Sequence, residues 1–372
     1  LSKPSAYTPK TFKVPSRYAT IQSAIDAAFT GDTILVSPGV YKENIDFKGK
    51  EIVVGSLFLT TGNGDYIKQT VIDGGKKGSV ATFDHMETPK SSLVGFTVKN
   101  GNSPTGGGIY CKSSSPTLSH LIITENTCGD MEFGYGAGVY CDASSPTIET
   151  VLIYNNTINN GYWSRYGAGI SLWNRSDATI RHSTIVGNTI DAYRENAKGS
   201  GLFCYNSSPQ IENTIIAYNA NGHGISNMEG GIPMFKNCCF WQNVPANFNG
   251  CSNELGKNIG VNINGDSCDV NQNICMLPFF SSVETNDFSL LEYSPCLGAG
   301  MSNVENVKDI YGNLRPSPTG SAMDIGAIES PLSKPSAYTP KTFKVPSRYA
   351  TIQSAIDAAF TGDTILVSPG VY

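Results

Sequence analysis

The sequence predicts an all-β fold, a solenoid in which short strands stack in successive coils. Three observations carry this prediction: a repeated pattern of about one coil in length, a composition rich in turn-forming residues, and an amphipathic segment placed to cover one end. Five similar segments begin at Gly106, Gly136, Gly167, Gly199 and Gly222. Most of them have an apolar strand after a glycine pair, a turn at or near Ser-Ser-Pro, a second apolar strand and an asparagine. Repeats of 20 to 50 residues with this content indicate a β-solenoid.

The composition excludes several classes of protein. Of the 372 residues, 40% are hydrophobic, 15% are charged and 39 are glycine, which is too apolar for a disordered chain and too poor in charge for a coiled coil. The net charge is −5, so no basic footprint supports nucleic-acid binding, and no apolar run has the length of a membrane span. Nucleic acid and membrane are therefore not expected partners.

One asparagine falls at an equivalent place in each coil. Stacked about 4.8 Å apart, such side chains can hydrogen-bond up and down the solenoid and satisfy a dry turn, as in an asparagine ladder. The glycine pairs are interpreted as corner residues and not as a nucleotide loop, because no long helical pattern follows them. The predicted ladder consists of Asn100, Asn126, Asn156, Asn188, Asn219 and Asn243.

An internal copy sets the expected domain organisation. Residues 332–372 repeat residues 1–41 without one difference, at an offset of 331, which indicates a window of a longer tandem array or the cut ends of a repeating polymer. The predicted parts are a connector at 1–18, a solenoid unit at 19–330 and the start of the next unit at 331–372. The predicted junction between units consists of Ile21, Ile25, Phe29, Pro331, Pro335, Pro340 and Phe343.

The ends of the unit carry a family resemblance. Residues 19–30 predict a capping helix with one apolar face, and residues 19–56, ATIQSAIDAAFTGDTILVSPGVYKENIDFKGKEIVVGS, resemble the opening of right-handed parallel β-helix domains of the pectin-lyase-like type. Segments within 287–329, such as Asp324-Ile-Gly-Ala-Ile-Glu329, resemble the closing part of bacterial surface and secreted members. The resemblance implies a right-handed β-helix with coils at 33–250 and a closing region at 251–329. It implies no single activity, because this fold hosts lyases, hydrolases, esterases, adhesins and tail spikes.

A catalytic constellation is not evident in the sequence. Lyases of this fold need aspartates for calcium and a basic residue, and the hydrolases need convergent carboxylates, but Asp73, Asp84, Asp142 and Asp177 have no base in register. The histidines, His85, His120, His182 and His223, lack the spacing of a zinc motif. The sequence therefore predicts a protein that is not an enzyme, with no cofactor and no metal. Calcium is left open as an alternative, but no motif indicates it.

The loops between coils carry aromatic and basic residues that are expected to stack into one face. Such a face can bind a glycan by ring stacking or a neighbouring filament, because aromatic residues and arginine are typical anchors. The alternative is that these loops only pack on each other and cover the coils. The residues of this predicted face are Phe133, Tyr135, Tyr162, Trp163, Arg165, Tyr166, Tyr193 and Arg194.

The ten cysteines divide into an inward set and a closing set. Cys111, Cys141 and Cys204 are equivalent to an apolar position and are expected to face the core. Two disulfides are expected among Cys251, Cys268, Cys275 and Cys296, which would imply an extracellular, oxidising setting. The neighbours Cys238 and Cys239 cannot both face inward on a strand, so one is expected to be exposed or paired with a loop cysteine such as Cys128.

Together these features predict a structural repeat unit of an extracellular or cell-surface filament, stalk or adhesin. The expected partners are identical units joined end to end, and also a glycan or neighbouring filaments. The alternative is a carbohydrate-active enzyme of the same fold, a polysaccharide lyase or hydrolase, or a non-catalytic glycan-binding module.

Overall fold

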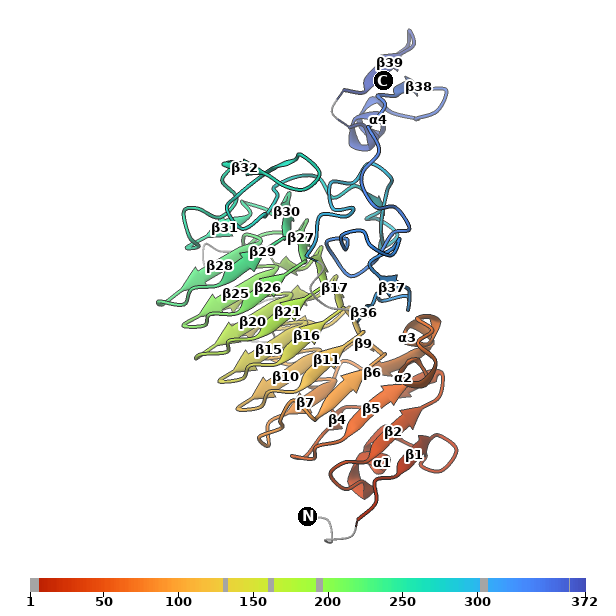
Figure 1. The fold of residues 1–372 in the computed structure, drawn as a ribbon, viewed down its shortest axis with the longest axis vertical. Helices are drawn as coiled ribbons and strands as arrows, with labels where there is room; N and C mark the ends of the chain where they lie inside the picture. Colours follow the sequence, from red (N-terminus) through yellow and green to blue (C-terminus); the bar gives the residue numbers. More distant parts are fainter. Residues whose placement is uncertain (1–6, 130–132, 160–163, 192–196, 302–306, 361) are drawn as a thin grey trace. The chain divides into compact units, whose positions relative to one another are not determined.

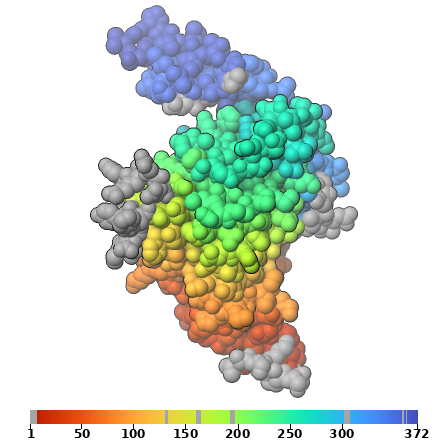
Figure 2. All heavy atoms as spheres, turned by 90° about the vertical axis from the view of Figure 1, so that its left-hand side faces the viewer, coloured from red at the N-terminus to blue at the C-terminus, as the bar shows by residue number. Residues whose placement is uncertain are grey.

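A computed structural model describes residues 7–129, 133–159, 164–191, 197–301, 307–360 and 362–372. The chain divides into two compact units, residues 1–335 and 336–372. In the first unit successive coils follow each other in chain order, seen as bands of colour from red to green in Figures 1 and 2. No helix within the described residues has the length and apolarity needed to cross a membrane.

Three long sheets build the solenoid, and a coil contributes one strand to each sheet. The first sheet contains β1 (Thr11–Val14), β2 (Thr33–Val36), β5 (Val53–Ser56), β8 (Ser92–Val94), β11 (Thr117–Ser119), β16 (Thr147–Glu149), β21 (Thr179–Arg181), β26 (Gln210–Glu212) and β29 (Met234–Lys236). The second contains β4 (Ile45–Asp46), β7 (Ala81–Phe83), β10 (Ile109–Lys112), β15 (Val139–Asp142), β20 (Ile170–Trp173), β25 (Leu202–Tyr205), β28 (Ile225–Met228) and β31 (Phe248–Asn249). The third contains β3 (Gly39–Lys42), β6 (Thr70–Asp73), β9 (Thr97–Lys99), β12 (Ile122–Thr124), β17 (Leu152–Tyr154), β22 (Thr184–Val186), β27 (Ile215–Ala217) and β30 (Cys239–Trp241).

Strand pairing within these sheets is parallel, and the all-β, parallel β-helix prediction is confirmed. Equivalent residues of adjacent coils lie opposite each other, as Leu118 does with Ile148 and Ile148 with Ile180. Because side chains alternate across a strand, these three are fully buried in the core while their neighbours face outward. One residue per strand thus continues the core from coil to coil.

Loops between the third and second sheets form two smaller parallel sheets. One contains β13 (Thr127–Cys128), β18 (Thr157–Ile158) and β23 (Thr189–Ile190). The other contains β14 (Phe133–Tyr135), β19 (Ser164–Tyr166) and β24 (Ala197–Lys198). Cys128, Ile158 and Ile190 are buried together between these loop sheets and the coils. The loops therefore extend the regular stacking outward from the solenoid.

A column of asparagines occupies the turn that leaves the third sheet. The Nδ2 of each donates to the Oδ1 of the next at 2.9–3.0 Å, and the column runs through Asn126, Asn156, Asn188, Asn219 and Asn243 and ends at Asn247. All but Asn247 are buried, so these bonds satisfy polar groups that water does not reach. A Cβ at Gly138 would meet the Gly169 carbonyl at 2.5 Å and Asn156 Nδ2 at 3.2 Å, which explains a glycine of the repeat.

Asn100 is not part of this column, contrary to the sequence prediction. The backbone N–H of Gly101 donates to Asn126 Oδ1 at 2.9 Å, so Gly101 holds the equivalent register position. The Asn100 side chain instead donates to Asp73 Oδ2 at 2.9 Å. The displacement is one residue, which the alignment of apolar segments alone does not resolve.

The N-terminal end is covered by α1 (Ile21–Ala27), within the predicted capping helix at 19–30. Thr20 caps it through the Ser23 backbone N–H, with Ser23 reciprocating, and Ile21 and Ile25 are fully buried. The predicted connector at 1–18 is wrong in part, because β1 lies within it: the alternation of Thr11–Val14 buries Phe12 and Val14 against the first coil. Two short helices, α2 (Phe58–Thr61) and α3 (Asp65–Gln69), follow β5.

The closing region covers the outer face of the third sheet. Its short antiparallel pairs are β32 (Gly260–Val261) with β33 (Ser267–Cys268), β34 (Phe280–Ser282) with β35 (Asp287–Leu290), and β36 (Val307–Lys308) with β37 (Leu314–Arg315). Phe288 packs edge-on against Tyr154 with ring centroids 5.2 Å apart, and the Ala327 N–H donates to Thr184 Oγ1 at 3.0 Å. From β12 to β30 the third sheet is therefore largely buried on both faces, which explains its consecutive apolar residues there, whereas Val40 of β3 is exposed.

The predictions for the cysteines are confirmed in part. Cys111, Cys141 and Cys204 are fully buried in the core, as predicted. The four cysteines of the closing region are free thiols, so the disulfides expected among Cys251, Cys268, Cys275 and Cys296 are not formed. Buried carboxylates order this region instead: Asp309 accepts from the backbone N–H groups of Tyr311, Asn313 and Glu329, and Arg315 Nε pairs with Glu329 at 3.1 Å.

The prediction for Cys238 and Cys239 is also wrong, because both are fully buried. Cys238 faces the solenoid core, whereas Cys239 faces the outer cluster under the closing region. Neither pairs with Cys128, whose thiol contacts the Tyr135 carbonyl. An outward position on the third sheet is a buried position here, because the closing region covers that face.

The second unit contains β38 (Thr342–Val345), α4 (Ile352–Ala358) and β39 (Thr364–Val367). Phe343, Val345 and Ala355 form its buried cluster. Of the predicted junction prolines, Pro331 and Pro340 are exposed and Pro335 is half-buried.

We predict that Asn188→Ala lowers the free energy of unfolding by about 3 kcal/mol or more, because several buried donors and acceptors lose their partner at about 1–3 kcal/mol each. Asn188 accepts from Asn156 and donates to Ile153 O and Asn219 Oδ1. Denaturant unfolding measures the change. Gln210→Ala, at an exposed side chain on the first sheet, is the control and should change stability by less than about 0.5 kcal/mol. Equal effects of both substitutions would contradict the role of the column.

Candidate functional site

Aromatic side chains form a continuous strip on the outer side of the second sheet, beside the loop sheet of β14 and β19. The strands β10, β15, β20 and β25 each place one or two rings outward, at the positions next to the buried residue of each coil. Tyr135 and Tyr166 of the loop sheet lie against them, in register with each other. The aromatic strip consists of Tyr110, Phe133, Tyr135, Tyr140, Tyr166, Trp173, Phe203 and Tyr205.

The rings follow each other along the solenoid axis. Tyr110 and Tyr140 are stacked with centroids 5.7 Å apart, and Tyr135 and Tyr166 are stacked at 5.6 Å with an interplanar angle of 4°. Near-parallel rings in contact are about 3.5–4 Å apart, so rings at these centroid distances are offset from each other. Trp173 contacts rings of both the loop sheet and the second sheet: its ring centroid lies 4.9 Å from that of Tyr135 and 4.7 Å from that of Tyr205.

Burial and hydrogen bonds fix the strip and leave its outer side accessible. Phe203 is fully buried and Tyr140 nearly so, whereas Tyr110, Trp173 and Tyr205 are half-exposed. The indole N–H of Trp173 donates to Ser171 Oγ at 2.8 Å, which sets the orientation of the ring. Burial, with a smaller contribution from nearby Asp142, raises the pKa of Tyr110, so its hydroxyl is a neutral donor and acceptor at physiological pH.

Polar side chains line the strip. Lys112 is exposed at the end of β10, and Asp142, at the equivalent place of β15, accepts from Asn174 Nδ2 at 2.7 Å. A row of half-exposed rings bordered by a few hydrogen-bonding groups is the composition of a site for an extended, amphipathic ligand.

The structure brings together part of the predicted aromatic face. Phe133, Tyr135 and Tyr166 belong to the strip, whereas Tyr162, Trp163, Tyr193 and Arg194 lie outside the described residues. The prediction that Arg165 belongs to this face is wrong. Its side chain points to the other side of β19 from Tyr166 and is buried, and its guanidinium donates to the Asp191 carbonyl. Arg165 lies within a strand, and the alternation of side chains along the strand places it inward.

Five members of the strip were missed from the sequence. Each belongs to the first strand of a repeat, where the segments Ile-Tyr-Cys, Val-Tyr-Cys, Leu-Phe-Cys-Tyr and Ser-Leu-Trp follow a glycine pair. Because the cysteine or leucine faces inward, its neighbours must face outward, and this signal was available in the sequence. The missed residues are Tyr110, Tyr140, Trp173, Phe203 and Tyr205.

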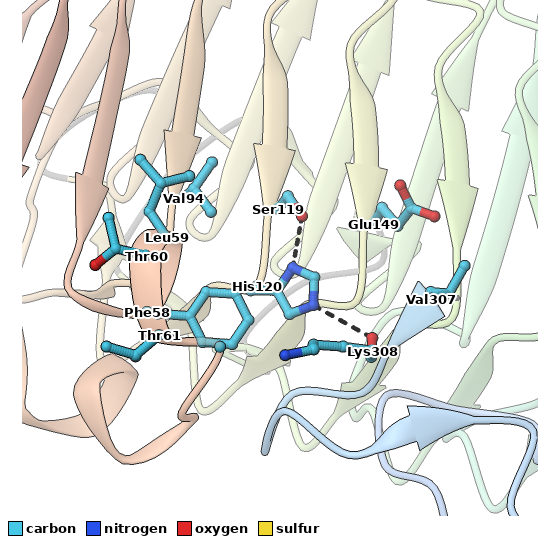
Figure 3. A pocket seen from close by; sticks show the side chains of 11 residues that line it. Phe58, Leu59, Thr60, Thr61, Val94, Ser119, His120, Glu149, Val307 and Lys308 are labelled. Atoms are coloured by element: carbon cyan, nitrogen blue, oxygen red, sulfur yellow. Dashed lines mark hydrogen bonds between the residues drawn. The ribbon is translucent and has the colours of Figure 1, made fainter. Parts of the chain in front are cut away.

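A pocket of about 590 Å³ lies elsewhere, between the first sheet and the closing region, and contains His120 (Figure 3). Ser119 Oγ donates to His120 Nδ1 at 2.7 Å, and His120 Nε2 donates to the Lys308 carbonyl at 3.2 Å. The Lys308 carbonyl can only accept, which assigns the proton to Nε2. Burial lowers the pKa of His120 to about 4, so the ring is neutral at physiological pH.

The hydrogen bonds of His120 and its neighbours show that the pocket lies where the closing region attaches to the coils. The same corner of successive coils is occupied by His120, Thr150, His182, Asn213 and Asn237, and each has a positive φ. Asn213 Nδ2 donates to the Met301 carbonyl at 3.0 Å and Asn237 Nδ2 donates to the Ala299 carbonyl at 2.9 Å. The corner thus hydrogen-bonds the closing region along several coils.

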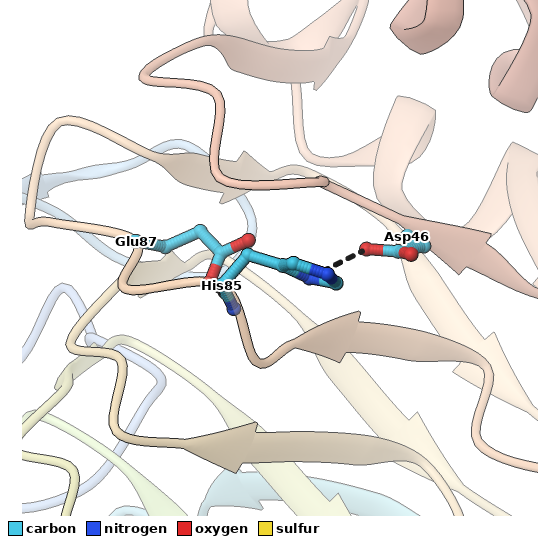
Figure 4. Close-up of side chains that lie close together, drawn as sticks. All are labelled: Asp46, His85 and Glu87. Carbon is cyan, nitrogen blue, oxygen red and sulfur yellow. Dashed lines mark hydrogen bonds and ion pairs between the residues drawn. The ribbon is translucent and has the colours of Figure 1, made fainter.

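Asp46, His85 and Glu87 are close enough together to hold a metal ion (Figure 4). His85 Nδ1 lies 3.9 Å from Asp46 Oδ1 and 2.6 Å from Asp84 Oδ1. Both Glu87 oxygens already accept, one from Gly49 N–H and the other from His85 N–H and Ser114 Oγ. These bonds give Glu87 a structural role, and the absence of a metal cofactor stays a prediction.

The other aspartates considered as catalytic candidates serve local turns. Asp73 accepts from Gly75 N–H and Asn100 Nδ2, and Asp177 accepts from Ser208 N–H. These bonds hold neighbouring coils in place and explain both residues without a ligand.

The comparisons with known proteins agree with this architecture. Residues 90–274 match a family model described as a right handed beta helix region. The chain is a right-handed parallel β-helix. No curated protein is significantly similar in sequence.

Two solved structures of similar fold are enzymes. The chain is similar to pectate lyase Pel9A, with 16% identity and a TM-score of 0.46, over 87% of this chain and 97% of the lyase. It is also similar to a pectin methylesterase from carrot, with 11% identity and a TM-score of 0.28, over 65% of this chain and 73% of the esterase. Both matched proteins are enzymes, which contradicts the prediction that this β-helix is not an enzyme, but likenesses this remote assign no activity to this chain.

We predict that acid destabilises the wild-type protein more than the variant His120→Asn. The folded-state pKa of His120, about 4, lies below the ordinary value of 6.5, so the unfolded chain binds more protons between these values and the contribution to stability is lost as pH falls. Asparagine keeps the positive φ and a side-chain amide. Urea unfolding at several pH values from 7 to 4 measures both proteins. Parallel stability curves would show that His120 is not responsible.

Proposed function

We propose that this β-helix binds an extended polysaccharide along the aromatic strip. The observation that carries the proposal is the strip itself: rings from four successive coils, half-exposed at Tyr110, Trp173 and Tyr205, beside hydrogen-bonding side chains. From β10 to β25 the strip spans three coil spacings, about 15 Å. Sugar rings present an apolar face and a rim of hydroxyls, and this surface offers aromatic faces and a polar border to match them.

The coil repeat supports a polymeric ligand over a single sugar. Four successive coils contribute rings, at one outward position of the strand in β10 and β15 and at the next outward position in β20 and β25, where Trp173 and Tyr205 lie. A chain of sugar residues can therefore contact several rings, and the contacts add within one molecule. The border contains Lys112 as well as Asp142, so the strip's charge alone does not choose between a neutral and an acidic polysaccharide. Binding measurements on both kinds make that choice.

An enzymatic version of this function, a polysaccharide lyase or hydrolase, rests on the same strip. The strip would hold the substrate, and cleavage of the bound polymer would distinguish an enzyme from a glycan-binding module. An extracellular location is part of this proposal. It does not rest on disulfides, because the closing-region cysteines are free thiols. The filament, stalk or adhesin role predicted from the repeat stays a prediction.

We predict that Trp173→Ala and Tyr205→Ala each weaken polysaccharide binding about tenfold or more, because buried aromatic anchors carry much of the energy of an interface. Affinity electrophoresis in gels containing cellulose derivatives, soluble chitin, polygalacturonate or alginate measures retention. Tyr66→Ala, at a half-buried tyrosine of α3 outside the strip, is the matched control and should leave binding unchanged.

Assays for reducing ends and for unsaturated uronates on the retained polysaccharide test cleavage in the same samples. Retention that is equal in the strip variants, the control and the wild type would overturn the proposal, as would failure of the wild type to bind any polysaccharide of the set.

A further inference from the structure

Ser119 and His120 form a hydroxyl–imidazole pair in the pocket on the first sheet (Figure 3). The Ser119 hydroxyl donates to His120 Nδ1 at 2.7 Å, and His120 Nε2 donates to the Lys308 carbonyl at 3.2 Å. The carbonyl selects the tautomer in which Nδ1 keeps its lone pair and accepts from the hydroxyl. A hydroxyl beside a base that a third group orients is the arrangement that activates a serine nucleophile.

Packing and charge keep the imidazole of His120 in the form of a base. Its ring centroid lies 4.5 Å from that of Phe58, with an interplanar angle of 32°. Burial is the largest cause of its lowered pKa of about 4, and the cations of Arg315 and Lys308 lower this pKa further. The ring is therefore unprotonated near neutral pH. A base of such low pKa accepts a proton less readily than an ordinary histidine, so a slow reaction is expected.

The rest of the pocket suits a small ligand with an apolar part. Its volume of about 590 Å³ lies within the range of small-molecule sites. Phe58, Leu59 and Val94 are apolar members of its lining, and Glu149 and Lys308 add charged groups of opposite sign (Figure 3). An apolar lining with a few polar groups beside a serine nucleophile fits a small ester with a short acyl chain.

We propose that this pocket hydrolyses small carboxylic esters, with Ser119 as the nucleophile and His120 as the general base. Ser119 Oγ adds to the carbonyl carbon of the ester while its proton passes to His120 Nδ1. The C–O bond to the alcohol then breaks, and the alcohol leaves with that proton. Water adds to the acyl-serine, again giving a proton to Nδ1, and the carboxylic acid leaves as the Ser119 hydroxyl is restored.

This activity goes beyond polysaccharide binding by the aromatic strip. The pocket is lined by residues of the first sheet and the closing region, whereas the strip lies on the second sheet. Either proposal can therefore fail without the other, and substitutions at Ser119 should leave polysaccharide retention unchanged.

A fluorophosphonate probe and p-nitrophenyl butyrate test the proposal on the full chain. The probe forms an Oγ–P bond with an activated serine and releases fluoride, and peptide mass spectrometry locates the modified residue. The wild type should be labelled at Ser119 and should hydrolyse the ester. Ser119→Ala should lose the label and at least about a hundredfold of the rate. Ser92→Ala, at a half-buried serine of the neighbouring strand β8, is the matched control and should behave as the wild type.

The dependence of labelling on pH tests the role of His120. Between pH 6 and 8 the labelling rate should be constant, because a ring with a pKa of about 4 is already deprotonated. A base with the ordinary pKa of about 6.5 would give a rise of about fourfold over this range. Circular dichroism verifies that each variant is folded.

Three results would overturn the proposal: no labelling of the wild type at Ser119, equal ester hydrolysis by Ser119→Ala and the wild type, or a fourfold rise of the labelling rate with pH. Because the probe maps the modified residue in the wild type itself, the first of these results is decisive even if the Ser119→Ala variant does not fold.

Discussion

The rest of the structure depends on the register of coil upon coil. Each residue lies opposite its equivalent in the next coil, about 4.8 Å away, so a side chain must be compatible with its own neighbours and with copies of itself. Asparagine meets this demand in the dry turn, because its amide donates to one neighbour and its oxygen accepts from the other. The buried column of Asn126 to Asn243 thereby holds the point where the large loops leave and re-enter the solenoid.

The same register turns single side chains into extended surfaces. Inward it lines up Leu118, Ile148 and Ile180 as core, and outward it lines up tyrosines and a tryptophan as the aromatic strip. The third sheet carries apolar residues on both faces, and the closing region uses this outer face and the polar corner at His120 and Asn213 to attach. The third sheet thus packs against the closing region, while the second sheet carries the aromatic strip on its outer side.

Local patterns in the sequence were sufficient to predict the coils, but they did not predict the contacts between segments that are far apart in the chain. The glycine pairs, the Ser-Ser-Pro turns and the inward cysteines are properties of each repeat, and they predicted the architecture and most of the asparagine column. Cys239 could not be placed, because its cover comes from residues near 296 and 325, far along the chain. Arg165 was assigned outward because its segment was treated as loop, whereas strand alternation in β19 turns it inward.

We propose that coil register builds a polysaccharide-binding surface from the aromatic strip. A crystal structure of the protein with an oligosaccharide of the best-retained polysaccharide tests this. We expect consecutive sugar rings over Trp173 and Tyr205, with hydroxyls bonded to side chains such as Asp142 or Lys112. A sugar bound in the pocket at His120, or one bound away from the strip, would contradict it.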